Sequence, residues 1–137
     1  KLASYDNIQY GGNLKPDEIP LRLDRGFGLI WDGNSIEGCL GEAGQYLRYN
    51  NPHKLSLCLS SGIPVVIWSG AAEAGFVDKN GLGLTVASIN ELPEIMEKLT
   101  EEKYNEFICN IRPVRERLIN GYYGRTAIQK AIELVTR

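Results

Sequence analysis

The apolar run at positions 63–68, I-P-V-V-I-W, constrains the fold of this chain more than any other feature. Its β-branched residues favour a strand, and its proline is tolerated only at the first position of one. The run directly follows Gly62, which ends a segment that is apolar around most of its circumference, as expected of a buried helix. A helix leading straight into a strand that is apolar on both faces is typical of a central strand in a parallel sheet.

The rest of the chain repeats this alternation of strand and helix. We expect further strands at residues 8–10, 26–31 and 84–86. We expect further helices over residues 16–23, with Pro16 at the first position, over residues 71–80, ended by Asn80-Gly81, and after the capping box Ser88-x-x-Glu91. Spacings of roughly 20 to 30 residues between strands predict an α/β fold, with a doubly wound parallel sheet and helices on both faces. A helix from about residue 100, kinked by Pro113 and ended by Gly121, and a final helix complete the chain.

Composition limits the classes of partner. A chain of 137 residues with 43% hydrophobic content predicts one globular domain, and a net charge of -2 argues against a broad nucleic-acid-binding face. Three dispersed cysteines and one histidine match no metal-site spacing and favour a reduced, cytoplasmic protein. No apolar run is long enough to span a membrane. The chain does not begin with methionine, so we expect it to be part of a longer protein.

Residues 50–54, N-N-P-H-K, are the strongest candidate for a ligand site. Asn51 is suited to cap a helix with Pro52 in its first turn, and a helix N-terminus presents free N–H groups and a positive dipole end to an anion. Lys54 opposes this dipole unless an anion is bound, so its position indicates a diphosphate site; the alternative is an exposed lysine. His53 could contact phosphate or ribose, or simply start the helix. The chain has no P-loop and no G-x-G-x-x-G sequence.

Other candidates follow predicted strands, where open parallel sheets bind their ligands. Gly11, Gly12 and Asn13 would let a flat base approach bare backbone, or would form a simple tight turn. Glu73 could accept hydroxyls of ribose or sugar, or could stabilise a helix start. Asp32 could bind sugar hydroxyls, although an Asx-turn is the more common role at such a position.

The order of these segments resembles a GT-B glycosyltransferase. The resemblance rests on F-G-L-I-W-D-G, Y-N-N-P-H-K, S-S-G-I-P-V-V-I-W, A-A-E-A and K-N-G-L-G-L-T-V, and extends from about Gln9 to the final helix. More narrowly, the chain is similar to the bacterial group that contains the streptococcal glucosyltransferases of serine-rich-repeat adhesins and β-1,6-galactofuranosyltransferase-like proteins.

The resemblance implies that the chain is the Rossmann-like, C-terminal half of a GT-B fold, binding a UDP-sugar without a metal or other cofactor. An N-terminal domain, outside these 137 residues, would bind the acceptor, a protein-linked glycan or polysaccharide. By matching motifs, the residues bordering uracil would be Tyr10, Gly11, Gly12 and Asn13, and those holding ribose and diphosphate would be Asn50, Asn51, His53 and Lys54. Glu73 is a weaker match, and no residue is assigned as catalytic.

The chain departs from the wider family in one respect. Many retaining GT-B enzymes have two glutamates eight residues apart around the phosphate-binding helix, where this chain has Tyr49 and Leu57. The usual ribose-binding carboxylate is therefore missing, and we expect this chain to bind its ligand but to need the other half for transfer.

Two other functions remain open from the sequence. The chain could be a non-catalytic nucleotide-binding or interaction module, or a receiver-type signalling domain that binds magnesium, although Asp32 is its one acid at such a strand end. A homo-oligomer is also open. We expect the final helices to expose an apolar face if they pack on another domain or subunit.

Overall fold

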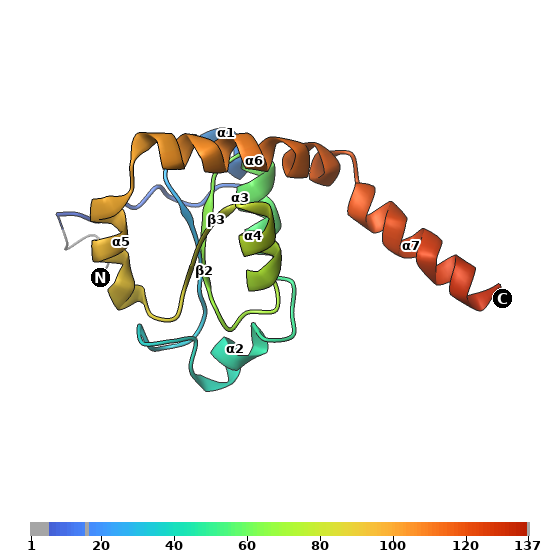
Figure 1. Ribbon diagram of the computed structural model, residues 1–137, viewed down its shortest axis with the longest axis horizontal. Coiled ribbons are helices and arrows are strands. Elements are labelled where there is room, and N and C mark those ends of the chain that lie inside the picture. Colours follow the sequence, from blue (N-terminus) through green and yellow to red (C-terminus); the bar gives the residue numbers. More distant parts are fainter. Residues whose placement is uncertain (1–5, 16, 137) are drawn as a thin grey trace.

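The computed structural model describes residues 6–15 and 17–136, and a small parallel sheet lies at the centre of this structure (Figure 1). The sheet has the strand order β1 (Gly28–Ile30), β2 (Val65–Trp68), β3 (Gly83–Val86). Both strand pairs are parallel, as predicted, and Leu29, Val66 and Leu84 lie side by side. The chain therefore has an α/β fold with β2 as its central strand.

The described residues also form eight helical segments. They are α1 (Ile19–Arg22), α2 (Gly41–Tyr46), α3 (His53–Ser61), α4 (Ala74–Asn80), the 3₁₀ turn η2 (Ile89–Glu91), α5 (Leu92–Lys98), α6 (Glu101–Ile119) and α7 (Tyr122–Val135). The predicted signals that end α3 and α4 are confirmed, because Gly62 and Gly81 both take the left-handed conformation after them. The capping box of Ser88 and Glu91 is confirmed as well.

Helices α3 and α4 pack against neighbouring strands of the sheet, α3 on β1 and β2 and α4 on β2 and β3. Ile30, Val65 and Ile67 are fully buried in the resulting core. A side chain at Gly28 would overlap the sulfur of Cys58, so glycine in β1 is what lets α3 approach the sheet so closely. Leu29 is half exposed, which leaves one face of β1 open to solvent.

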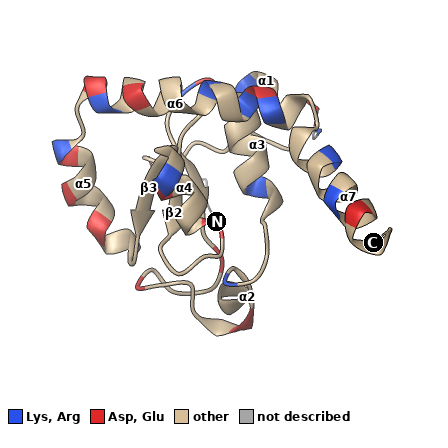
Figure 2. Ribbon diagram, turned by 45° about the vertical axis from the view of Figure 1, so that its right-hand side comes forward, with Lys and Arg blue, Asp and Glu red and all other residues tan. Residues whose placement is uncertain are grey.

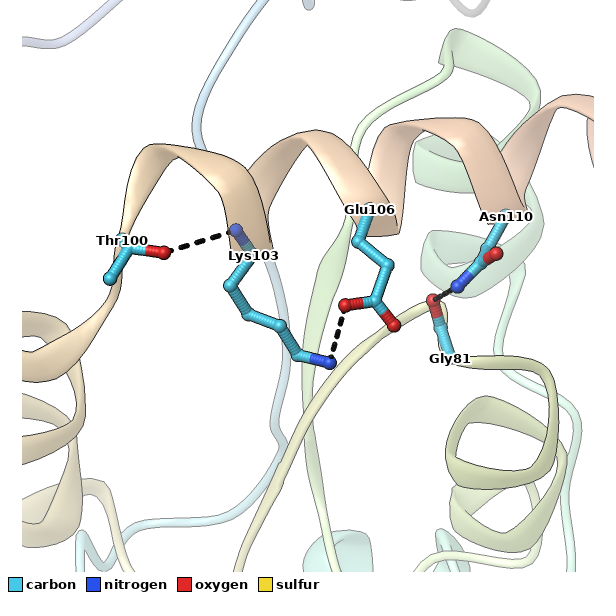
Figure 3. Close-up of polar contacts among 5 residues, drawn as sticks. All are labelled: Gly81, Thr100, Lys103, Glu106 and Asn110. Carbon is cyan, nitrogen blue, oxygen red and sulfur yellow. Dashed lines mark hydrogen bonds and ion pairs between the residues drawn. The ribbon is translucent and has the colours of Figure 1, made fainter.

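Helix α6 crosses the end of the sheet opposite α2 (Figure 1). Thr100 caps it by accepting a hydrogen bond from the backbone N–H of Lys103, and the side chain of Asn110 donates to the carbonyl of Gly81 (Figure 3). The second bond ties α6 to the turn between α4 and β3. The helix continues through Pro113, so the expected kink does not break it.

Helix α7 projects from the rest of the chain (Figure 1). None of its residues is buried, and Ile128, Ile132 and Val135 are exposed at spacings that place them along one side of the helix. The expectation of an exposed apolar face is confirmed for α7, whereas α6 buries Phe107, Ile111 and Val114. Charges along α5, α6 and α7 are of mixed sign (Figure 2).

The predicted elements at the N-terminal end are wrong or too long. Residues 8–10 form no strand, and Ile8 and Tyr10 are exposed, because none of the described strands pairs with them. The helix expected over residues 16–23 is the single turn α1, which has Pro20 near its start; the expected first proline, Pro16, lies outside the described residues. The helix expected from residue 71 begins at Ala74. Within the described part of the chain, no helix is long and apolar enough to cross a membrane.

Candidate functional site

The carboxyl ends of the strands and the start of α3 meet at one edge of the sheet. The chain leaves β1 into Trp31 and Asp32 and enters α3 at His53. A hydrogen bond from the backbone N–H of Ala72 to the carbonyl of Leu47 holds the segment after β2 against the segment before α3. The fold thus brings together loops that are about 20 to 40 positions apart in the sequence, as expected for a parallel sheet.

A cavity of about 530 Å³ opens at this edge. Its lining consists of Asp32, Tyr46 and all five residues at positions 50–54. The structure therefore assembles five of the residues singled out from the sequence, namely Asp32, Asn50, Asn51, His53 and Lys54.

Helix α3 begins one residue later than predicted, and its first turn has features that favour an anion. The N-cap is Pro52, which has no side-chain acceptor, and no acidic residue lies in the first turn. Asn51 is therefore not the cap, because the extended backbone of Pro52 precedes the first helical residue, His53. The first N–H groups and the positive end of the helix dipole thus receive no compensation from an acidic or capping side chain of this turn.

Lys54 does not point freely into water. Its Nζ donates to Oδ1 of Asp32 at 3.0 Å and to the carbonyl oxygen of Trp31 at 3.3 Å. The two side chains of this ion pair are 51% and 40% exposed, so each is still accessible from the cavity. Asp32 thus acts as the counterion of Lys54, a role that the sequence analysis did not assign to it.

Asn50 lines the same cavity and has a side-chain acceptor without a partner in the described part of the chain. Its side-chain oxygen is buried and has no hydrogen-bond partner among the described residues. A buried carbonyl oxygen without a partner is costly and is usually satisfied by water or a ligand. The helix start and Lys54 can therefore hold an anion, and the Asn50 oxygen needs a hydrogen-bond donor that the described residues do not supply.

Glu73 lies apart from this cavity. It is the N-cap residue of α4, without a side-chain capping bond, and it lines a second cavity of about 340 Å³ between α3, α4 and the α6–α7 junction. That cavity is mostly apolar, with Leu55, Phe76 and Leu118 in its walls, and it shares only Asn51 with the first. We regard the first cavity as the candidate site because its charged and amide groups converge there.

The residues at positions 10–13 are not among those that line either cavity. Tyr10, Gly11, Gly12 and Asn13 are all exposed, and the hydroxyl of Tyr10 donates to the side-chain oxygen of Asn13. Their predicted contact with uracil stays a prediction.

Sequence reasoning missed Tyr46, which lines the candidate site from the end of α2. Helix α2 contains Gly41 and Gly44, residues of low helix propensity, so its sequence gives little sign of a helix. The contact of Arg48 with Trp68 was not predicted either; the guanidinium stacks over the ring, 4.7 Å from its centroid, and Arg48 lines neither cavity. Neither residue carries a local motif by which it could have been found.

Two buried thiols lie behind the site. Burial raises the pKa of Cys39 and of Cys58, and the charge of Lys54 opposes this rise in both. Cys109, on α6, is exposed. A raised thiol pKa and burial both slow alkylation, because the thiolate is the reactive form.

We therefore expect one thiol to react quickly in the native chain at pH 8 and two more only after unfolding. Titration with a chromogenic disulfide reagent, with and without denaturant, measures the number of reactive thiols and the rate at which each reacts. A Cys109→Ser variant should abolish the fast phase, and a fast phase that persists in that variant would contradict the assignment.

Comparison with known proteins decides the family. Residues 1–131 match the sequence model of the family described as "Glucosyltransferase 3-like, C-terminal domain". The chain belongs to this family. The resemblance to glycosyltransferases that the sequence motifs carry is thereby confirmed.

Individual relatives of this Glucosyltransferase 3-like domain agree. It is 41% identical over 131 residues to β-1,6-galactofuranosyltransferase WbbI of Escherichia coli K12, a match covering 93% of this chain and 39% of the relative. It is 31% identical over 127 residues to Glucosyltransferase 3 of Streptococcus gordonii, covering 92% and 37%. It is 27% identical over 139 residues to Glucosyltransferase 3 of Streptococcus parasanguinis, covering 96% and 40%. The chain thus spans about two fifths of the length of these relatives.

Proposed function

We propose that this chain is the donor-binding part of a glycosyltransferase and holds the diphosphate of a UDP-sugar at the start of α3. The observation that carries the proposal is Lys54, which lines the cavity at an uncapped helix N-terminus that has no first-turn acid. Family membership supports glycosyl transfer as the reaction, because the relatives are named as glycosyltransferases.

Diphosphate is the ligand group that suits this arrangement best. Successive N–H groups at a helix start bind phosphate oxygens, and the helix dipole and a lysine add positive charge without a metal ion. In glycosyl transfer the diphosphate is the leaving group, so charge that develops on it would be stabilised by the same groups. We therefore propose a metal-independent site.

Other groups of the cavity would orient the nucleoside and the sugar. The buried oxygen of Asn50 would accept a hydrogen bond from a ribose hydroxyl, and Asn51 and His53 lie beside it in the lining. Tyr10, Gly11, Gly12 and Asn13 remain our candidates for contact with uracil. Glu73 fits this proposal least, because it lines the second cavity.

The wider proposal concerns the whole protein. We propose a GT-B enzyme in which this chain supplies a Rossmann-like, doubly wound domain and another domain supplies the acceptor site. Transfer would take place in the cytoplasm, onto a protein-linked glycan or a polysaccharide. The names of the relatives include both a galactofuranosyltransferase and glucosyltransferases, so several donor sugars need to be compared.

Ligand-induced stabilisation tests the proposal against its two rivals. A ligand that binds only the native state raises the unfolding temperature by mass action. We expect UDP to raise it, and Mg²⁺ alone to leave it unchanged. Stabilisation by Mg²⁺ without any effect of UDP would favour a receiver-type module.

A transfer assay separates an enzyme from a binding module. The natural protein that contains this chain should release UDP from a matched UDP-sugar in the presence of acceptor glycan. Binding of UDP without turnover of any of a panel of UDP-hexoses, pyranose and furanose, would favour a non-catalytic nucleotide-binding module.

A further inference from the structure

The ion pair between Lys54 and Asp32 places a negative charge beside the group that we expect to bind phosphate. Lys54 Nζ lies 3.0 Å from Asp32 Oδ1, and both residues line the same cavity. Asp32 lies two residues after the end of β1, whose last residue, Ile30, is fully buried. A ligand anion that reaches Lys54 must therefore approach the carboxylate of Asp32.

This arrangement has two opposite effects on an anion. The carboxylate holds the lysine side chain near the start of α3 while the site is empty, which lowers the entropy lost when the lysine engages a ligand. Once an anion binds, the carboxylate repels it, and the repulsion grows with the number of negative charges on the ligand. Asp32 is thus able to distinguish ligands that differ only in charge.

The donor and the product of glycosyl transfer differ in this way. In a UDP-sugar the terminal phosphate is esterified and carries one negative charge. In free UDP the same phosphate carries close to two at neutral pH, because its second pKa is near 6. We place this terminal phosphate nearest to Lys54, so the extra charge of the product would lie beside the Asp32 carboxylate.

We propose that Asp32 is a charge-discriminating residue, which disfavours the UDP product relative to the esterified donor and so assists product release. This inference rests on the proposed function of the site. Asn50, whose side-chain oxygen is buried without a hydrogen-bond partner among the described residues, lines the same cavity.

The test compares two ligands that differ by one charge and lack the transferred sugar, namely UDP and its β-phosphate methyl ester. Dissociation constants are measured by calorimetry at neutral pH for the natural protein that contains this chain and for its Asp32→Asn variant. We expect Asp32→Asn to tighten the binding of UDP about two- to fivefold, the range of an exposed ion pair, and to tighten the methyl ester less. The ratio of the two constants is the decisive quantity, because a general change in the shape or stability of the site would move both constants together.

Glu106→Gln provides a matched control. Glu106 pairs with Lys103 at 2.9 Å on α6, and its side chain is 56% exposed, so the variant removes a similar ion pair away from the cavity. We expect it to change neither constant.

The outcomes separate this inference from the proposed function. If the parent protein binds UDP but Asp32→Asn leaves the ratio unchanged or weakens UDP, the role of Asp32 is wrong and the UDP site stands. If the parent protein does not bind UDP at all, the proposed function fails and the inference fails with it.

Discussion

Replacement of Lys54 by alanine is expected to weaken UDP binding by about 10- to 150-fold, the loss of one charge-assisted contact to phosphate. The side chain lines the candidate cavity and lies in the first turn of α3, where it and the helix dipole would act on the same anion under the proposed function. Removing it also leaves Asp32 next to the ligand without its counterion. Calorimetric titration of the natural protein that contains this chain with UDP gives the affinity directly.

Lys103→Ala is a close control for this variant. Lys103 is paired with Glu106 at 2.9 Å and its side chain is 49% exposed, nearly the same as the 51% of Lys54. It lies on α6 and does not line the cavity. We expect Lys103→Ala to bind UDP as the parent does, and equal affinities for the Lys54 and Lys103 variants would remove the phosphate role from Lys54.

The core of the fold could be predicted because its signals are local. The apolar run ending at Trp68 predicts β2, and Gly62 and Gly81 mark the ends of α3 and α4 through the left-handed conformation that glycine adopts at no steric cost. The start of α3 was placed one residue too early, since proline at position 52 fits both the first turn and an extended cap. The proposed anion site is unaffected by this shift, because the proposal depends on the helix N-terminus and not on the identity of the cap.

The contacts between distant segments could not be predicted. Asp32 and Lys54 are 22 positions apart, and only the close packing of α3 on β1 brings them together. Tyr46 reaches the site from a short helix with two glycines. The strand expected at residues 8–10 has suitable residues but no described partner strand, and a strand gains its stability from the neighbours it pairs with.

At Gly83, the first residue of β3, the packing of the sheet leaves room only for glycine. It pairs with Val65 of β2, and its φ of 154° lies in a region that other residues rarely adopt. A Cβ at this position would overlap the backbone nitrogen and carbonyl of Val65. The neighbouring Leu82 is fully buried, so β3 cannot move away from β2 without disturbing the core.

We therefore expect Gly83→Ala to lower the free energy of unfolding by about 2 to 5 kcal/mol, from backbone strain together with overpacking. The thermal midpoint of the 137-residue chain should fall by roughly 10 °C. Gly75→Ala makes the same chemical change in α4, where a Cβ would meet nothing within 4 Å. Because alanine favours a helix over glycine, this control should gain up to about 1 kcal/mol. Equal midpoints for the two variants, measured by circular dichroism, would show that β3 does not pack against β2 as closely as the structure has it.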